Sequence, residues 1–390
     1  MPLDFDALYQ GIYQMVATLP SRGPGQKLAS ARAYLREVAP DDLRHRLKSR
    51  EHKVPWLVAL PINSLADTFA PCAIPDAFSV VAADGSSVPP DRHSPVRYYM
   101  INIGHAAITY GPHAHAAMSS CLQFCHQEQD LYFDPAGKRI PIDGTRLGVK
   151  MAVEEMVGLY QAAKDTPRPT VALCDGTLIL WNMQNEDKEL QAHYLERYLR
   201  ALDGFRREGM PIASYISFPG SDDLKNSLRI MLCHTPGSKC SQCPHHTREQ
   251  ELCAFLESVR DRNLFHGLLD LGHRSDIFES QSAILQKYRE HHIQFFYINV
   301  GDEIARVEAP QWVMNDDAML DLVHGTVIDQ CRRSGQYPPY PPALIEAHEQ
   351  AVITTAERQT IETAIEQTLA RAGITYLRSA KDRSKRSRGV

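Results

Sequence analysis

Two short apolar runs in this chain each end in an aspartate that is followed by glycine and a hydroxyl residue. Residues 78–83 (FSVVAA) run into Asp84, and residues 170–174 (TVALC) run into Asp175. Apolar runs of this length are typical of buried strands, although an Asp-Gly pair alone is also common in turns. An acid at the end of a buried strand is held rigidly at the rim of a sheet. Two such strands side by side would therefore bring Asp84 and Asp175 together.

The segment between these runs predicts further strands and then a helix that carries a third acid. Residues 97–110 have strand composition, and residues 148–163 (GVKMAVEEMVGLYQAA) have helical composition and period. Glu155 lies on the apolar stripe of this helix, whereas Glu154 lies on the polar one. A glutamate that faces a sheet is costly unless something compensates it, and a metal ion would do so. We expect Glu155 at the site and Glu154 in solvent, although a slip of one residue would exchange them.

Three carboxylates at one sheet rim suit hard divalent cations. Mg²⁺ and Mn²⁺ prefer oxygen ligands and retain several waters. In pairs roughly 4 Å apart they clamp the attacking and leaving oxygens of a phosphodiester. Asp84, Glu155 and Asp175 therefore predict metal-dependent phosphodiester hydrolysis.

The rest of the chain alternates helical and strand patterns, which predicts an α/β fold with a mixed sheet flanked by helices. Helices are expected over 188–208 and 221–231, a strand over 212–218, a hairpin over 294–308, and helices on both sides of the 337–342 loop. We predict three regions: a helical N-terminal lead-in over 1–75, a catalytic domain over 76–375, and a basic, mobile tail over 376–390.

Four segments resemble the NurA nucleases, which have an RNase H-like core: VAADGS, LCDGTL, FFYINVGDEIARVEAPQWV and YPPALIEAH. The resemblance runs from about Phe78 to Ile365. It implies that Asp84, the helix glutamate and Asp175 are metal ligands, and that Tyr340 and His348 belong to the active site. Tyr337 is an alternative to Tyr340 because the sequence YPPYPP is doubled, but the spacing to the histidine favours Tyr340.

The same resemblance implies an activity and an assembly. The activity would be a 5′ to 3′ exonuclease and a single-strand endonuclease that act on DNA and prefer Mn²⁺. The assembly would be a homodimer bound to a HerA-type hexameric ATPase. The biological role would be DNA end resection and repair or defence against phage.

Other residues have two interpretations each. His348 could donate a proton to a phosphate or leaving oxygen, or could ligate metal. Arg306 could reach a DNA phosphate, or could pair with Glu303 or Glu308 at a sheet edge. Lys225 is either a phosphate contact or an ordinary surface lysine.

A cysteine-rich insertion is expected at about residues 233–253. Its members are Cys233, Cys240, Cys243 and Cys253. Four thiolates can enclose one structural Zn²⁺ or hold an iron-sulfur cluster. The spacing is not that of a standard zinc finger, and reduced cysteines without a metal would give the same pattern.

The composition favours a soluble, cytoplasmic protein. Hydrophobic residues make up 43% and charged residues 23%, and the net charge is −5. No apolar stretch approaches the eighteen or more residues of a membrane span, and the N-terminus lacks an apolar signal core. We expect no association with membranes. The negative net charge does not exclude nucleic acid, because the local field matters.

Two other classes of function are compatible with the residues. One is a catalytically inactive RNase H-like module that binds nucleic acid or serves as a scaffold for an ATPase, which acids in all three places argue against. The other is a cysteine hydrolase that uses Cys121 or Cys125 with His126, but no nucleophile elbow is recognisable. The chain has no P-loop motif, so any unwinding of DNA would need a partner.

Overall fold

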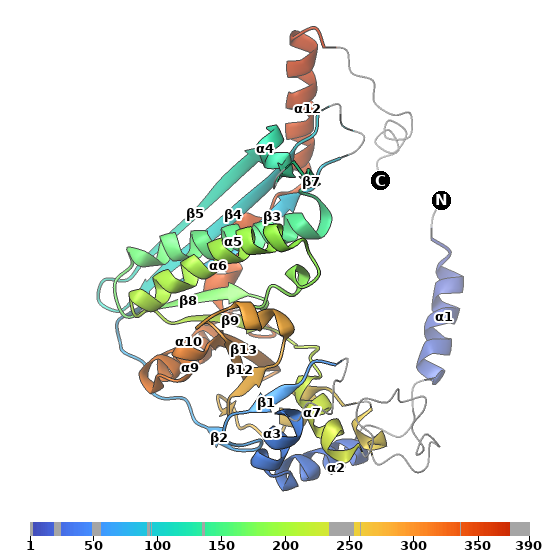
Figure 1. The fold of residues 1–390 in the computed structure, drawn as a ribbon, viewed down its shortest axis with the longest axis vertical. Helices are drawn as coiled ribbons and strands as arrows, with labels where there is room; N and C mark the ends of the chain where they lie inside the picture. Colours follow the sequence, from blue (N-terminus) through green and yellow to red (C-terminus); the bar gives the residue numbers. More distant parts are fainter. Residues whose placement is uncertain are drawn as a thin grey trace.

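A single large twisted sheet organises the protein (Figure 1). The computed structural model describes residues 3–18, 25–48, 56–91, 94, 96–134, 137–233, 253–257, 259–335 and 337–374. Among these residues the sheet has eleven strands, and nine of them follow the order β1-β11-β12-β13-β9-β8-β3-β4-β5. The short strands β2 (Thr68–Phe69) and β10 (Arg274–Ser275) join it at the side of β12.

Five of the strands form the unit that carries the predicted acids. They are β3 (Phe78–Val88), β4 (Tyr99–Tyr110), β5 (His115–Cys125), β8 (Thr170–Asp175) and β9 (Ile212–Ile216). Strands β3, β4 and β5 form an antiparallel meander, whereas β8 runs parallel to β3 and β9 runs parallel to β8. This arrangement confirms the predicted RNase H-like mixed sheet.

The sheet continues beyond β9 through antiparallel strands. They are β13 (Ile304–Pro310), β12 (Ile293–Asn299), β11 (Phe278–Ser280) and β1 (Ala59–Pro61). The β12–β13 hairpin was expected from the sequence. A separate two-stranded sheet contains β6 (Tyr132–Phe133) and β7 (Ile140–Pro141).

Helices cover both faces of the sheet. On one face lie α5 (Gly144–Lys164) and α6 (Lys188–Arg207), which connect β5 to β8 and β8 to β9. On the other face lie α9 (Gln311–Met314), α10 (Asp317–Arg333) and α11 (Pro342–Ala351). A hydrophobic core lies on each face of the sheet, and alternate residues of β3 contribute to the two cores. Val81 and Ala83 pack with α5 and α6, whereas Val80 and Ala82 pack with α10 and α11.

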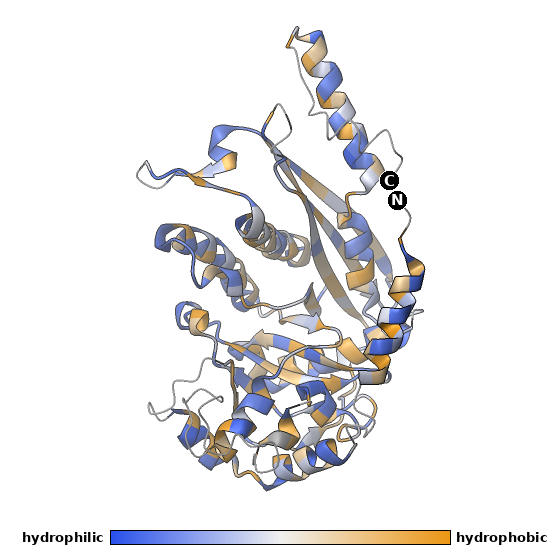
Figure 2. Ribbon diagram, turned by 90° about the vertical axis from the view of Figure 1, so that its right-hand side faces the viewer, coloured by the Kyte–Doolittle hydropathy of each residue, from blue (hydrophilic) through white to orange (hydrophobic). Residues whose placement is uncertain are grey.

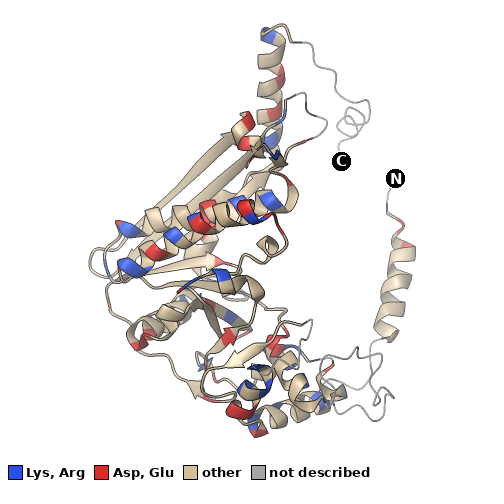
Figure 3. Ribbon diagram, viewed as in Figure 1, with Lys and Arg blue, Asp and Glu red and all other residues tan. Residues whose placement is uncertain are grey.

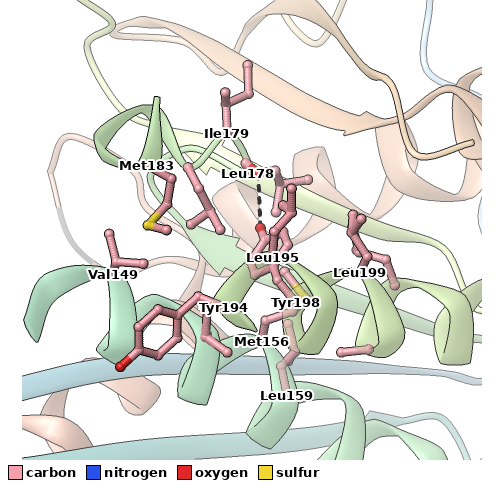
Figure 4. Packing of buried hydrophobic residues seen from close by; sticks show 14 of the residues in the cluster. Val149, Met156, Leu159, Leu178, Ile179, Met183, Tyr194, Leu195, Tyr198 and Leu199 are labelled. Atoms are coloured by element: carbon pink, nitrogen blue, oxygen red, sulfur yellow. Dashed lines mark hydrogen bonds between the residues drawn. The ribbon is translucent and has the colours of Figure 1, made fainter. Parts of the chain in front are cut away.

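The first of these cores fixes the segment that follows β8. Val149, Met156 and Leu159 of α5 pack against Leu195 and Leu199 of α6 (Figure 4). The hydroxyl of Tyr198 on α6 donates a hydrogen bond of 3.0 Å to the carbonyl of Leu178, shown by the dashed line. The loop after the second acid is thereby tied to a helix.

The N-terminal lead-in is helical only in part. Its helices are α1 (Phe5–Thr18), α2 (Gly25–Glu37) and α3 (Pro40–Lys48). Residues 59–61 and 68–69 were expected to be helical, but they form β1 and β2. The reason is that the apolar run before Pro61 pairs with β11, with Ala59 opposite Ser280. The predicted domain boundaries stay a prediction.

The remaining helices lie at the ends and edges of the fold. They are α4 (Glu128–Leu131), α7 (Asp223–Leu232), α8 (Asp261–Phe265) and α12 (Thr355–Arg371), with short 3-10 turns at Trp181–Met183, Ala254–Leu256 and Ala283–Lys287. Helix α12 projects from the top of the molecule in Figure 1. Within the described residues, no helix is both long and apolar enough to cross a membrane. The predicted basic tail lies outside the described residues.

Candidate active site

Two of the predicted acids lie next to each other on neighbouring parallel strands. The pairing of β3 with β8 ends with Ala83 opposite Cys174. Asp84 and Asp175 are the next residue on each strand, and strand alternation points both towards the face that α10 and α11 cover. The expectation that each acid ends its strand is correct for Asp175 but wrong for Asp84, because β3 stays paired with β4 as far as Val88.

Glu155 approaches these aspartates from the opposite face of the sheet. Its carboxylate, carried by α5, occupies the space that a β-carbon at Gly85 would need. Burial, followed by the negative charges of Asp84 and Asp175, raises the pKa of Glu155 to about 8. The three carboxylates are therefore close enough to repel one another.

Glu154 points away from this cluster and makes an ion pair instead. Its carboxylate accepts hydrogen bonds of 2.7 and 3.1 Å from the guanidinium of Arg197 on α6. Only 11% of the Glu154 side chain is exposed. The expectation of an ordinary solvated charge is wrong, because α6 packs alongside α5 and places Arg197 beside this glutamate.

Helix α11 is seated tightly on β4 where Gly104 lacks a side chain. A β-carbon at this position would overlap backbone atoms of Ala347 and Ala351. Gly104 is also the residue that pairs with Asp84 across β4 and β3. The close approach therefore brings His348 to the aspartate, where its Nδ1 lies 2.6 Å from Asp84 Oδ2. The histidine side chain stays 60% exposed.

Of the two candidate tyrosines, only Tyr340 contacts an acid of the cluster. Its hydroxyl donates a hydrogen bond of 2.7 Å to Asp175 Oδ1, and its ring meets Tyr215 edge-on at 5.3 Å. Burial and the charge of Asp175 raise the pKa of Tyr340, so its hydroxyl stays protonated. Tyr337 is 83% exposed, and its hydroxyl donates to Asp302 in the β12–β13 turn.

Glu308 holds the loop after Asp175 in place, a role that the sequence did not suggest. Its carboxylate accepts a 2.7 Å hydrogen bond from the Thr177 hydroxyl and a 3.0 Å bond from the Leu178 amide. Gly176, with φ of +76°, makes the turn, and its amide donates to the Tyr215 carbonyl. The only feature of the sequence that could have indicated this role is the position of Glu308 among apolar residues near the end of β13.

The two candidate DNA contacts are occupied by ion pairs. Arg306 is buried, and its guanidinium lies 2.9 Å from Asp223 and 2.8 Å from Glu308. Of its two interpretations, pairing within the protein is the one found, because the flanking strands enclose β13. Lys225 pairs with Asp222 at 2.7 Å and is 11% exposed. Neither side chain is presented for a phosphate contact.

The predicted cysteine-metal site stays a prediction. Cys240 and Cys243 lie outside the described residues, whereas Cys233 follows α7 and Cys253 precedes a 3-10 turn, both partly buried. Cys121 and Cys125 have a spacing that would also suit a helix, but they lie on strand β5, where Cys121 is exposed and Cys125 is buried.

The fold and the site together define an RNase H-like α/β protein with a carboxylate cluster across two neighbouring parallel strands. The chain belongs to the NurA family: the model of the NurA domain matches residues 78–353. This family and this fold support a nuclease that cleaves by hydrolysis. No curated protein sequence matches the chain.

Comparison with one solved structure, that of a NurA nuclease, agrees with this fold. The crystal structure of the NurA nuclease from Sulfolobus solfataricus aligns with a TM-score of 0.50 and 12% identity, covering 93% of this chain and 98% of that chain. The structure of LC9-RNase H1, a type 1 RNase H with the type 2 active-site motif, aligns with a TM-score of 0.23 and 12% identity over 40% of this chain and 71% of that one. This second alignment leaves more than half of the present chain unmatched.

Proposed function

We propose that the chain is a cytoplasmic, divalent-metal-dependent DNA nuclease that uses Asp84, Glu155 and Asp175 as its metal ligands. The observation that carries the proposal is the meeting of these three acids, two on one face of the sheet and one reaching them past Gly85. We further propose a 5′ to 3′ exonuclease and single-strand endonuclease activity that prefers Mn²⁺, by analogy with the family.

The carboxylates suit a metal ion whose coordination shell is completed by the substrate. Across the described part of the chain, no three His, Cys, Asp or Glu side chains are arranged to enclose an ion by themselves. Mg²⁺ and Mn²⁺ sites on phosphate substrates need only one or two carboxylates, with water and phosphate oxygens as the other ligands. Burial, followed by the negative charges of Asp84 and Asp175, raises the pKa of Glu155, and a bound cation would stabilise its charged form.

A pair of bound ions would supply Lewis-acid stabilisation of the attacking and leaving oxygens of the phosphodiester. The residues of the chain then have distinct tasks. His348 uses Nδ1 to contact Asp84, which leaves Nε2 for a phosphate or a leaving oxygen. Tyr340 holds Asp175 in one orientation through its hydroxyl hydrogen bond.

The direct test is cleavage of end-labelled single- and double-stranded DNA with Mn²⁺, Mg²⁺ or EDTA. We expect cleavage with Mn²⁺ and none with EDTA. Asp84→Ala and Asp175→Ala should each lower the rate by orders of magnitude, because a lost metal ligand removes several kcal/mol of transition-state stabilisation. Asp165→Asn is the matched control, since this exposed acid lies before β8, at the opposite end of that strand from Asp175.

The same assay separates this proposal from the alternative function. A folded wild-type protein that binds DNA but cuts none under any metal condition would favour the inactive RNase H-like binding or scaffold module. Mn²⁺-dependent cleavage that Asp84→Ala leaves undiminished would reject the proposed site.

We also propose a homodimer that docks on a HerA-type hexameric ATPase, in DNA end resection and repair or in phage defence. Two described surfaces support a protein partner. Helix α1 has no buried residue and only one charged residue, Asp6, and it stands apart from the body in the view of Figure 3. Figure 2 colours many of its residues as hydrophobic. Its exposed large hydrophobic side chains are Phe5, Leu8, Tyr9, Ile12, Tyr13, Met15 and Val16.

The second surface is strand β5, which forms one edge of the sheet. Its sequence, HAAMSSCLQFC, has no Lys, Arg, Asp or Glu, and nearly all of its side chains are exposed. Proteins usually protect an open edge with charge, so an uncharged edge favours an interface. Light scattering after size-exclusion chromatography tests the dimer, and co-purification tests the ATPase. A monomer that is fully active on long duplex DNA and indifferent to the ATPase would reject the assembly.

A further inference from the structure

Phe218 has an unusual backbone conformation for a large side chain. Its φ is +45°, and it is one of two non-glycine residues with positive φ among those described. For an aromatic residue this conformation is sterically costly, and glycine would adopt it freely. Even so, 63% of the phenylalanine is exposed to solvent. Burial of the ring therefore does not explain why the chain holds an aromatic residue there.

The position of Phe218 places it at the rim of the sheet beside the candidate active site. Strand β9 runs parallel to β8, with Tyr215 paired to Asp175. Phe218 follows Tyr215 by three residues in the direction in which both strands end. Three residues span at most about 10 Å even when fully extended, which is no more than the length of about three stacked nucleotides of one strand.

Three contacts of a buried acid hold this loop in its strained conformation. Glu303, 5% exposed, accepts hydrogen bonds from the Phe218 amide at 3.1 Å, the Ser217 hydroxyl at 2.9 Å and the Tyr215 hydroxyl at 2.9 Å. The Tyr215 ring in turn contacts Tyr340. One connected set of residues thus fixes both the aromatic residue and the tyrosine on Asp175.

Arg262 covers one face of the Phe218 ring. Its guanidinium carbon lies 3.7 Å from the ring centroid, and its Nη1 donates a hydrogen bond of 2.7 Å to the Pro219 carbonyl. A cation on one face of an aromatic ring, with the rest of the side chain largely exposed, is an arrangement that also suits stacking of a nucleobase. Strained residues held by such contacts cluster at ligand sites.

We propose that Phe218 is a base-stacking residue that positions a single DNA strand across the carboxylate cluster. This inference rests on the proposed DNA nuclease activity and deepens it. Phe218 is a positioning residue, because it binds a base a few nucleotides from the scissile phosphate and takes no part in bond cleavage. Stacking of one base on an aromatic side chain changes affinity by about tenfold.

The test uses single-stranded oligonucleotides that carry 2-aminopurine or an abasic site at successive positions, with the full chain in EDTA and in Ca²⁺. Wild-type protein should quench 2-aminopurine most at one position, and an abasic site there should weaken binding about tenfold. Phe218→Ala should abolish both effects, and Phe218→Trp should restore them. In Mn²⁺, Phe218→Ala should raise KM about tenfold and change kcat little.

A matched control and a stability measurement separate stacking from a structural role. Phe69→Ala removes an aromatic residue that also carries an arginine over its ring, Arg274, but lies on β2, far along the sheet. This variant should bind and cleave as wild type does. Phe218→Gly relieves the strained φ, so its melting temperature should not fall, while the position-specific effect should still be lost.

Failure of the stacking inference can be distinguished from failure of the proposed nuclease activity. Equal quenching and equal KM for wild type and Phe218→Ala, in a protein that cuts DNA, would overturn the stacking inference and leave the nuclease proposal intact. A wild-type chain that neither binds nor cuts any of these oligonucleotides would overturn both. A lower melting temperature in Phe218→Gly would show that the ring serves the fold instead.

Discussion

The carboxylate of Glu155 lies in the space that a side chain on Gly85 would fill. This relationship joins two faces of the sheet, because the glutamate belongs to the helix on one face while Asp84, the neighbour of Gly85, points to the other. The glycine that follows the first acid therefore leaves room for the carboxylate of the third acid.

Gly85→Ala should consequently displace Glu155 without unfolding the protein. The overlapping atoms are Oε1 of Glu155 and Cγ of Met151, which both belong to flexible side chains. These side chains can move, so the free energy of unfolding should change by only about 1 kcal/mol. Cleavage should fall by at least tenfold. Gly148→Ala on α5, where nothing lies within 4 Å, is the control and should stabilise by about 1 kcal/mol with activity unchanged. Equal activity of both variants would show that the position of Glu155 does not matter.

Substitutions of the two adjacent glutamates of α5 should affect different properties, cleavage for Glu155 and stability for Glu154. Glu155→Gln should lower cleavage by orders of magnitude, because an amide replaces a proposed metal-ligand carboxylate. The cost in stability should be small, because glutamine has nearly the same shape as the protonated acid that the raised pKa favours. Glu154→Gln should keep most activity but lose about 1 kcal/mol of stability with its Arg197 pair. Cleavage assays and urea denaturation of both variants measure this, and the opposite ranking would mean that the helix is rotated.

The stability of the metal-free protein should depend on pH through Glu155. Because its folded pKa is raised from 4.5 to about 8, the folded state holds the proton more tightly than the unfolded state does. The resulting stability is complete below pH 4.5 and is lost as pH rises through about 8. Burial, followed by the negative charge of Asp223, raises the pKa of Asp261 to about 7, which adds a loss of stability of the same sign.

Urea denaturation in EDTA between pH 5 and pH 9 tests this dependence. Glu155→Gln should flatten the upper part of the curve, and Mn²⁺ should bind more tightly as pH rises towards 8, with release of a proton. Parallel curves for wild type and Glu155→Gln would contradict the raised pKa.

Tyr340 and Tyr337 should differ sharply despite their shared Tyr-Pro-Pro context. Tyr340→Phe removes the hydroxyl that donates to Asp175 and should lower kcat by roughly tenfold to a thousandfold, the range for a lost positioning or electrostatic hydrogen bond. Tyr337→Phe removes only an exposed bond to Asp302 and should act as wild type. Steady-state kinetics on a short oligonucleotide compares them. A larger loss of kcat with Tyr337→Phe would show that Tyr337, in the first Tyr-Pro-Pro, is the active-site tyrosine.

The cysteine-rich segment is predicted to hold about one tetrahedral ion with a structural role. Elemental analysis of purified protein should find zinc or iron near one equivalent, and removal of the ion should lower stability without removing the carboxylate site. Cys240→Ser should lose the ion and keep Mn²⁺-dependent cleavage per folded molecule. Protein that contains neither metal would end this prediction.

The sequence by itself determined the elements that have a strong local pattern. The periodicity of residues 148–163 gave helix α5 and the side on which Glu155 lies, and the apolar runs gave the cores of β3 and β8. These features are local, because helix and strand periods of apolar residues are set by backbone geometry within a few residues. The family resemblance added Tyr340 and His348.

Only the tertiary structure decided which side chains meet across the fold. Asp175 and Tyr340 are 165 positions apart, and Asp84 and His348 are 264 apart. The sequence left open whether Arg306 contacts DNA or pairs with an acid of the protein. Its burial between the flanking strands favours the ion pairs with Asp223 and Glu308. Such contacts depend on strand order and on close approaches at residues such as Gly104, which no local pattern of polar and apolar residues encodes.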